Sequence, residues 1–377
     1  MTLMSSDSRF ALNAVCPYFT MFPLEYPMRA LRLARLRGFK RPLICDPYCG
    51  RGTTIFAARL RGLPAYGVDI APVAVAIARA KLAVTDTEEV MNLVEDLLDE
   101  CRTVTVPAGE FWDLAFHEST LTMLCRIRHA LFKRRSSGAA SMLRAIMLGG
   151  LHGPRAKTEE GASYFSNQMP RTFSAKPAYA VKYWRRKRLY PQPIDVCAVI
   201  RKRLTRAFNS HLPLPSTAPA DVKCADSRLA SAFERIDGRI THVVTSPPYY
   251  GLRTYSQDQW LREWFLGGPS YVDYDVDPGL NHGSPELFSR SLAHVWNNVG
   301  DNAASRIQLY IRFGGIRSRK TSADEILRDS LQYSKHPWRI ITRRSAATAA
   351  SGKRQALQML ATHGPVEESD YVVGLAY

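Results

Sequence analysis

The stretch from Pro42 to Val84 constrains the fold of this chain most strongly. A short apolar run, "PLICD", leads into the glycine turn "PYCGRGTT" and then into "IFAARLRG", whose apolar residues have helical spacing. "AYGVDI" reads as a second strand, and "APVAVAIARAKLAV" reads as a second helix with Pro72 near its first turn, where proline is tolerated. The order strand, helix, strand, helix predicts an α/β fold with a parallel sheet and right-handed crossovers.

The α/β pattern returns only after a long interruption. "DVKCADSR" reads as a strand and "LASAFERI" as a helix, and "THVV", "IQLYIRFGG" and "DYVVGLAY" supply further strands. The intervening segment is rich in arginine, lysine, aromatic residues, proline and serine, and it includes the expected loop "KRRSSGAAS". We therefore expect one half of an α/β core at 1–104, an inserted basic module at 105–218 and the second half of the core at 219–377.

Composition indicates a basic, globular protein. Hydrophobic residues make up 46% of the chain and charged residues 23%. The 51 Lys and Arg against 34 Asp and Glu give a net charge of +17, which favours a polyanionic partner. No stretch reads as a membrane span or a signal peptide, so a cytoplasmic location is expected. The seven cysteines form no CxxC pair, and we expect buried reduced thiols and no metal site.

The turn "DPYCGRGT" is the first candidate site. Gly50 and Gly52 form a GxG pair between a strand and a helix, where backbone can approach a ligand closely. The third glycine of the dinucleotide fingerprint would fall at position 55, which is Ile55, and this departure weakens a nicotinamide or flavin interpretation. Taken alone, a GxG pair is more typical of a simple tight turn than of a ligand site, and only its context changes this interpretation.

Three acidic residues at strand ends point to the ligand class. Asp69 lies about 20 residues after the loop, where an acid can bind both hydroxyls of a ribose. Asp46 precedes the loop and can accept a hydrogen bond from an ammonium group, and Asp226 can accept one from an adenine amino group. Because no phosphate-binding GK[ST] follows the loop, this set suits a nucleoside that carries an amino acid, as S-adenosylmethionine does.

The second candidate site is "TSPPYY", which ends the "THVV" strand. If this strand lies beside the first one, the Ser246 hydroxyl and the carbonyls around Pro247 become acceptors whose direction the Pro247 and Pro248 rings fix. Such acceptors would hold an exocyclic amino group, and the ring of Tyr249 would give its base a face to stack upon. A base inside a duplex must be flipped out to reach such a pocket. The alternative is an ordinary strand terminator with buried tyrosines beyond it.

The two motifs together resemble those of the DNA amino-methyltransferases, which methylate cytosine N4 or adenine N6. "YFTMFP" resembles the motif that these enzymes place ahead of the glycine loop, and "FSNQMPRTFS" and "YYGLRTYSQDQWLREWFLGGP" resemble segments of bacterial and phage N4-type enzymes. Serine before Pro-Pro-Tyr is the form typical of the cytosine-N4 group. Tyr48 departs from the family, which usually has phenylalanine there.

This resemblance implies a Rossmann-like S-adenosylmethionine-dependent methyltransferase sheet with an inserted, basic target-recognition module. It assigns the catalytic loop to Ser246, Pro247, Pro248 and Tyr249. It assigns cofactor binding to Phe19, Thr20, Asp46, Gly50, Gly52, Asp69 and Asp226. The implied reaction is methylation of the N4 amino group of a flipped cytosine in duplex DNA, by direct attack of the amine and without a covalent cysteine intermediate. Adenine-N6 methylation on the same fold and a non-catalytic nucleic-acid-binding protein are the alternatives.

The inserted module is the candidate for DNA recognition. Its basic residues are interleaved with Tyr179, Tyr183 and Trp184, a pattern that suits phosphate contact and base stacking as well as a solvated basic face. The residues expected to bind DNA are Arg171, Lys176, Lys182, Arg185, Arg186, Arg188 and, beyond the catalytic loop, Arg253. The expected partners are double-stranded DNA and a cognate restriction endonuclease, in a bacterial or phage-encoded protein associated with the nucleoid. The oligomeric state is left open.

Overall fold

The computed structural model describes residues 8–18, 23–32, 36, 38–39, 41–155, 161–167, 169, 176–209, 218–236, 238–251, 256–274, 279–316, 321–346 and 366–375. The chain forms two compact units. The helical unit comprises Met1–Tyr18, Arg79–Pro213 and Tyr255–Asp277, and the sheet unit comprises Phe19–Ala78, Leu214–Thr254 and Pro278–Tyr377.

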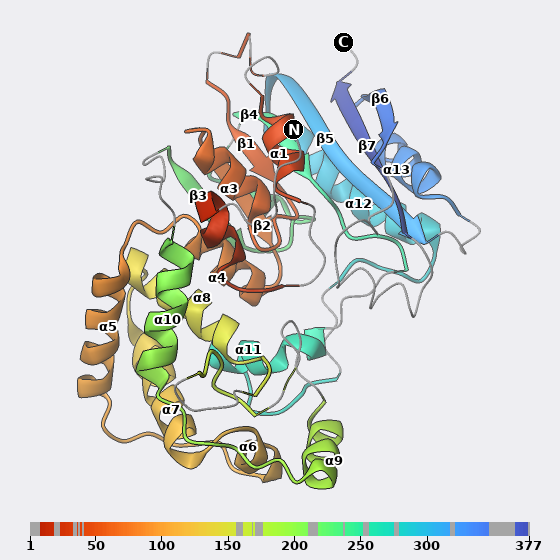
Figure 1. Cartoon of the computed structure of the whole chain (residues 1–377). Coiled ribbons are helices and arrows are strands. Elements are labelled where there is room, and N and C mark those ends of the chain that lie inside the picture. The colour runs from red at the N-terminus through yellow and green to blue at the C-terminus, as the bar shows by residue number, and fades with distance from the viewer. Residues whose placement is uncertain are drawn as a thin grey trace. The chain divides into compact units, whose positions relative to one another are not determined.

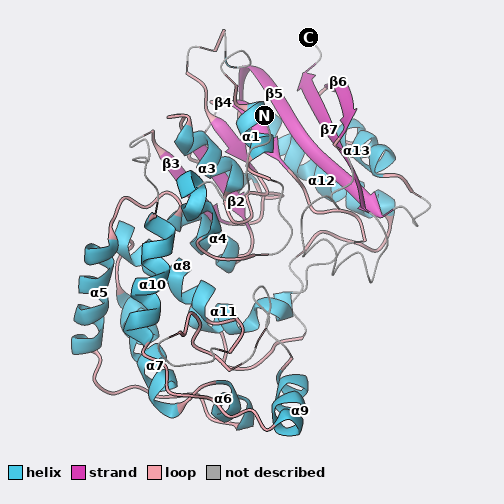
Figure 2. Cartoon of the chain, viewed as in Figure 1, coloured by secondary structure: helices cyan, strands magenta, loops and turns pink. Residues whose placement is uncertain are grey.

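The sheet unit is built on seven strands in the order β3-β2-β1-β4-β5-β7-β6 (Figures 1 and 2). The strands are β1 (Ile44–Asp46), β2 (Ala65–Asp69), β3 (Ala220–Cys224), β4 (Ile240–Thr245), β5 (Ala303–Ile316), β6 (Trp338–Ser345) and β7 (Val366–Leu375). The first five pair in parallel, and β7 runs antiparallel to both β5 and β6. This is the predicted Rossmann-like α/β fold. Its strand order reverses between β1 and β4, and ligands bind at such a switch point in doubly wound sheets.

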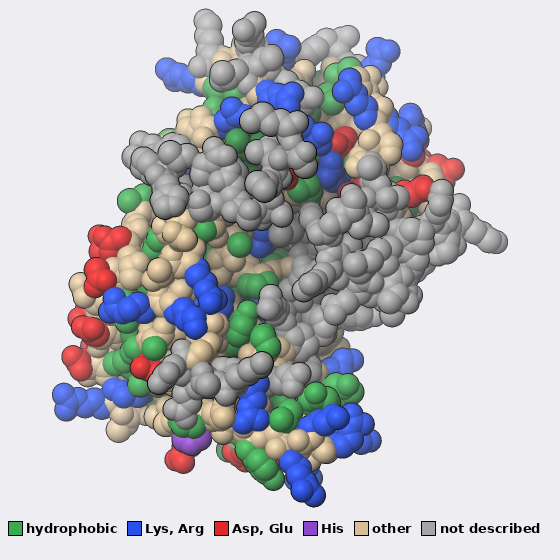
Figure 3. Space-filling view, in the orientation of Figure 1, with side chains coloured by type: hydrophobic (Ala, Val, Ile, Leu, Met, Phe, Trp, Pro, Cys, Tyr) green, Lys and Arg blue, Asp and Glu red, His purple; other side chains and the backbone are tan. Residues whose placement is uncertain are grey.

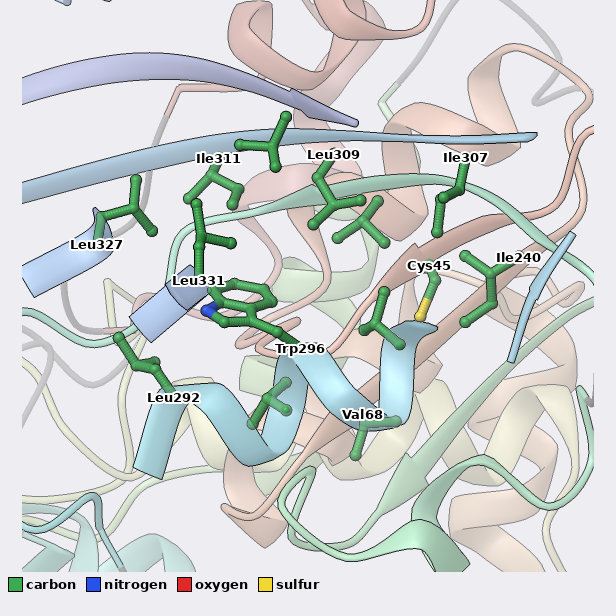
Figure 4. Packing of buried hydrophobic residues seen from close by; sticks show 14 of the residues in the cluster. Cys45, Val68, Ile240, Leu292, Trp296, Ile307, Leu309, Ile311, Leu327 and Leu331 are labelled. Atoms are coloured by element: carbon green, nitrogen blue, oxygen red, sulfur yellow. The ribbon is translucent and has the colours of Figure 1, made fainter. Parts of the chain in front are cut away.

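Helices cover both faces of this sheet. In Figure 1, α1 (Glu25–Ala30) and α3 (Thr53–Leu60) lie in front of the strands, and α12 (Pro285–Asp301) and α13 (Ala323–Gln332) lie behind them. Figure 4 shows Trp296 of α12 packed between Leu331 of α13 and the β5 residues Leu309 and Ile311. The indole Nε1 of Trp296 donates to Ser330 Oγ at 3.0 Å, so its polar atom is satisfied inside the core. This core holds the strand ends in fixed register.

The helical unit consists of short helices around an aromatic core. Its elements are η1 (Ser8–Ala14), α5 (Thr87–Glu100), α6 (Glu110–Ala115), α7 (Glu118–Lys133), α8 (Gly138–Gly150), α9 (Pro177–Lys187), α10 (Val196–Phe208), η3 (Ser256–Gln259) and α11 (Trp260–Phe265). The side chains of Asp86, Ser137 and Asp195 cap the N-termini of α5, α8 and α10. Trp112 of α6 contacts Trp260 and Trp264 of α11, with ring centroids 5.8 and 4.7 Å apart.

Several local predictions differ from the structure. "LASAFERI" forms only the 3-10 turn η2 (Ala230–Phe233), and the loop expected in "KRRSSGAAS" is short because α8 begins at Gly138. The seven cysteines are reduced, but Cys224 is exposed and Cys197 is half-buried. The expected boundaries at 104 and 218 also differ from those of the two units, since α5 and α11 belong to the helical unit. Among the described residues, no helix has the length and apolar character that a membrane span needs.

Candidate functional site

The glycine loop joins β1 to α3 through two residues in the left-handed backbone region. Gly50 has φ +49° and Gly52 has φ +76°. A Cβ at Gly52 would lie 2.7 Å from Cβ and 2.9 Å from Cα of Ala78, so this glycine permits the loop to contact α4 (Pro72–Ala80) closely. A Cβ at Gly50 would meet no atom of the described residues within 4 Å. The loop is therefore tightly packed at Gly52 and open at Gly50.

Asp69, at the end of β2, holds this loop in place through a backbone hydrogen bond. Its Oδ2 accepts a hydrogen bond from the Gly50 N–H at 2.8 Å, and its Oδ1 accepts one from the Ala71 N–H at 2.9 Å. Burial raises the pKa of Asp69, and the backbone hydrogen bonds from Ala71 and Gly50 act in the opposite direction. Asp69 thus contacts the glycine loop directly, which the sequence did not predict. Its role in binding a ribose stays a prediction.

Asp46 is fully buried at the end of β1. Its Oδ1 accepts from the Tyr48 N–H at 3.2 Å, whereas its buried Oδ2 has no hydrogen-bond partner among the described residues. Burial raises the pKa of Asp46 to about 7, although the neighbouring hydroxyls of Thr245 and Thr54 lower it. A buried carboxylate oxygen without a donor is costly, so this position suits a ligand that brings a donor or a positive charge.

The raised pKa of Asp46 predicts that the ligand-free protein loses stability as the pH rises from about 4 to about 7. Over this window the unfolded chain has released a proton that the folded protein still holds, since the ordinary pKa is 3.8. The free energy of unfolding should therefore fall by up to about 4 kcal/mol and then level off above pH 7. Urea denaturation between pH 4 and 8 measures this.

Asp46→Asn isolates that contribution from other buried acids whose pKa is also raised, such as Asp69. The variant should lose most of the pH dependence between pH 4 and 7. An identical pH profile for the variant and the wild type would show that Asp46 is ionised in the folded protein throughout.

The turn after β3 brings Asp226 beside the glycine loop. The Ser227 hydroxyl donates to the Pro47 carbonyl at 2.5 Å, and Asn298 Nδ2 donates to the Ser227 carbonyl at 2.9 Å. The Asp226 carboxylate pairs with Arg228, whose Nε and Nη2 lie 2.9 and 2.6 Å from Oδ2. Although burial acts to raise it, the pKa of Asp226 is lowered by these hydrogen bonds. Asp226 was expected to accept a hydrogen bond from an adenine amino group. In the structure its carboxylate already accepts hydrogen bonds from Arg228, a residue that the sequence interpretation did not use.

The Ser-Pro-Pro-Tyr loop follows β4 directly, next to β1 in the sheet. Pro247 is buried and Pro248 is exposed, and Ser246 Oγ lies 3.4 Å from the Tyr249 hydroxyl. That hydroxyl donates to Glu368 Oε1 of β7 at 2.8 Å, and the Tyr249 ring meets Phe313 of β5 edge to face at 5.6 Å between centroids. Burial, and then the charge of Glu368, raise the pKa of Tyr249, so it stays a neutral donor.

An ion-pair cluster beyond Tyr249 was not found from the sequence. Arg312 of β5 pairs with Asp370 of β7 through two hydrogen bonds of 2.7 and 2.9 Å, and Arg29 lies 3.7 Å from the same carboxylate. The guanidinium of Arg312 also lies 4.3 Å from the centre of the Tyr26 ring. Glu368 and Tyr249 are 119 positions apart in the sequence, and no local pattern signals their contact.

Five of the predicted DNA-contacting residues lie on or at the ends of α9 in the helical unit, where Figure 3 shows lysine and arginine side chains gathered: Lys176, Lys182, Arg185, Arg186 and Arg188. Arg185 forms an ion pair with Glu110, and the guanidinium of Arg186 lies 6.0 Å from the centre of the Tyr183 ring. Trp184 is buried, so its expected role as a stacking surface for DNA is wrong. Arg188 follows the last residue of α9 and has a left-handed backbone, with φ 51°, which ends the helix. Phe19, Thr20, Arg171 and Arg253 lie outside the described residues.

Comparison with known proteins gives no close relative. No family model matches the chain, and no curated protein matches it. Among solved structures, the chain is similar to an rRNA methyltransferase, aviRa, from Streptomyces viridochromogenes, at 16% identity and a TM-score of 0.36, covering 99% of this chain and 94% of that one. A geranyl diphosphate methyltransferase in complex with GPP and sinefungin shares 8% identity, with a TM-score of 0.32 and coverage of 97% and 77%. At TM-scores this low, the likeness carries no argument about the activity of this chain.

Proposed function

We propose that this chain is an S-adenosylmethionine-dependent DNA methyltransferase that modifies the exocyclic N4 amino group of a flipped cytosine. One observation carries the proposal. The glycine loop with Asp46 and the Ser246–Tyr249 loop follow two adjacent parallel strands, β1 and β4, at the switch point of a doubly wound sheet. A ligand bound at this edge would lie between a cofactor loop and a base-holding loop.

The hydrogen-bonding groups at this edge of the sheet fit the proposed cofactor. Buried Asp46, with an oxygen that lacks a donor, suits the ammonium of an amino acid, and its hydroxyl neighbours Thr54 and Thr245 add polar partners. Asp69 accepts backbone hydrogen bonds from Gly50 and Ala71, and its carboxylate retains capacity to accept one from a ribose hydroxyl. When bound, S-adenosylmethionine supplies an electrophilic methyl group on a sulfonium.

The residues of the second loop would orient the target amine. The Ser246 hydroxyl and the carbonyls around Pro247 can accept hydrogen bonds from both amino protons, which directs the nitrogen lone pair and offsets the positive charge that develops on nitrogen. The ring of Tyr249 offers a face for the base, while Glu368 fixes its hydroxyl. Serine ahead of Pro-Pro-Tyr favours cytosine N4. Adenine N6 is the rival target on the same fold.

Mass spectrometry of nucleosides tests the proposal directly. DNA from a methylation-free host that expresses the chain should contain N4-methylcytosine, and DNA from cells expressing Asp69→Ala should not. N6-methyladenine in its place would keep the fold and mechanism but overturn the base. Absence of both from DNA, with a folded wild-type chain that binds the cofactor, would contradict a DNA methyltransferase. A cognate restriction endonuclease is an expected partner, and its activity on unmodified host DNA would place the chain in a restriction-modification system.

Replacing Arg185 and Arg186 of α9 together by glutamine should flatten the salt dependence of duplex-DNA binding. Each phosphate contact adds about 0.9 to the slope of log K against log salt, so the loss of two contacts lowers the slope by roughly 2. Fluorescence anisotropy with a labelled duplex at several salt concentrations measures it. Arg201→Gln, at an exposed position of α10 where the side chain pairs with Glu88, is a control that removes one charge elsewhere on the unit. An unchanged slope in the double variant would move the phosphate contacts away from α9.

A further inference from the structure

Among the described residues, five aromatic side chains of the helical unit are strongly exposed. One is Tyr190, and the other four stand on α7, on α9 and on the segment after α11. Phe132, Tyr179, Tyr271 and Tyr274 are 68%, 67%, 66% and 58% exposed. Large rings are normally more buried than this, and a group of exposed rings marks an interaction site. These four are called the aromatic track below. Tyr271 and Tyr274 fall outside the module that the sequence predicted to contact DNA.

Contacts along the segment 264–274 connect the members of the track. At one end a Cβ on Gly267 would lie 2.6 Å from the Phe132 ring, and Arg128 of α7 donates to the carbonyls of Trp264 and Gly268 at 2.7 and 3.3 Å. In the middle, Trp112 Nε1 donates to the Ser270 carbonyl at 3.2 Å. These bonds fasten the backbone on which Tyr271 and Tyr274 stand.

At the other end the segment meets α9. The ammonium of Lys176, which precedes the first turn of this helix, lies 5.7 Å from the centre of the Tyr274 ring. Tyr179 stands in that same first turn. The cation–π contact therefore joins the 271–274 segment to the basic surface of α9.

We infer that the aromatic track binds unpaired nucleotides of single-stranded DNA. Exposed rings close to the cations of α9 match the physics of single-strand binding, in which bases stack on aromatic faces and lysine or arginine contacts the phosphates. A duplex keeps its base faces stacked and paired, so it could use only the cations. The choice of DNA, as opposed to RNA, rests on the proposed function. The aromatic track itself is not needed for methyl transfer, and the inference names the ligand that it binds.

Binding of a labelled dT16 strand and of a 16-base-pair duplex to the full chain, without cofactor, tests this. Tyr271→Ala combined with Tyr274→Ala should weaken dT16 binding by at least about 25-fold, since each stacked base contributes about 1–3 kcal/mol. Its duplex affinity should change by less than about twofold. Lys176→Gln should instead lower the dT16 salt slope by about 0.7, because it removes one phosphate contact.

Two control proteins separate stacking from folding and from charge. Tyr271→Phe combined with Tyr274→Phe keeps both rings and should retain dT16 affinity. Tyr333→Ala removes an exposed ring of the sheet unit that lies over Arg290, and it should also leave dT16 binding unchanged. Undetectable dT16 binding by the wild type, or equal losses for duplex and single strand in the alanine variant, would overturn the inference. Tighter binding to rU16 than to dT16 would overturn the choice of DNA. None of these results depends on whether methylated nucleosides are found.

Discussion

Tyr249→Ala is expected to lower kcat on a natural duplex by on the order of 100-fold while changing cofactor affinity by less than about twofold. The ring would supply the stacking face for the flipped base, and stacking contributes about 1–3 kcal/mol. The ring also packs on Phe313, at 5.6 Å between centroids, so its removal loosens the loop that carries Ser246. Steady-state methyl transfer and calorimetric titration with the cofactor measure the two quantities.

Tyr249→Phe separates the ring from its hydroxyl. This variant keeps the stacking face but loses the hydrogen bond to Glu368, which is 2.8 Å long in the wild type. We expect a loss of on the order of tenfold or more in kcat, because a hydrogen bond to a charged carboxylate contributes about 1.5–3 kcal/mol. Glu368→Gln should reproduce the effect of Tyr249→Phe, because it weakens the same contact from the other side. Wild-type turnover in Tyr249→Ala would show that the base does not stack on this ring.

Asp69→Ala is expected to weaken cofactor binding by on the order of 100-fold and to leave DNA binding intact. Two effects add. The variant removes an acceptor for the ribose, and it leaves the Gly50 N–H without the carboxylate oxygen that it contacts at 2.8 Å. A hydrogen bond to a charged group contributes about 1.5–3 kcal/mol, which gives the expected size. Calorimetry with the cofactor measures the change, and fluorescence anisotropy with a duplex checks DNA binding.

Asp221→Ala is the matched control for this variant. Asp221 lies on β3 of the same sheet, and its side chain accepts from the neighbouring Val222 N–H and contacts Arg235 at the surface. Its removal should leave cofactor affinity within about twofold of the wild type. If Asp69→Ala bound the cofactor as tightly as Asp221→Ala, the ribose assignment would be wrong and Asp69 would serve only to hold the glycine loop.

The sequence predicted the parts of the sheet unit whose signals are local. Short apolar runs that end in a turn correspond to β1, β2, β3 and β4, because strand formation there depends on residues within one segment. The glycines of the loop were found because a left-handed φ and close backbone approach favour that residue type. Asp46 and Asp69 end their strands and Ser246 follows β4 directly, so parallel pairing alone placed them at one edge.

Tertiary structure decided what depends on contacts between distant segments. Glu368 contacts Tyr249 only because β7 folds back antiparallel to β5. Arg228 hydrogen-bonds Asp226, and this pairing cannot be read from the positions of the acidic residues alone. Trp184 is buried by the aromatic core of the helical unit, whereas Tyr271 and Tyr274 are exposed beside α9. The sequence by itself therefore determined the Rossmann-like core and the residues at its strand ends. Which side chains are buried, paired or exposed was decided by packing, because burial is a property of the neighbours that a folded chain brings together.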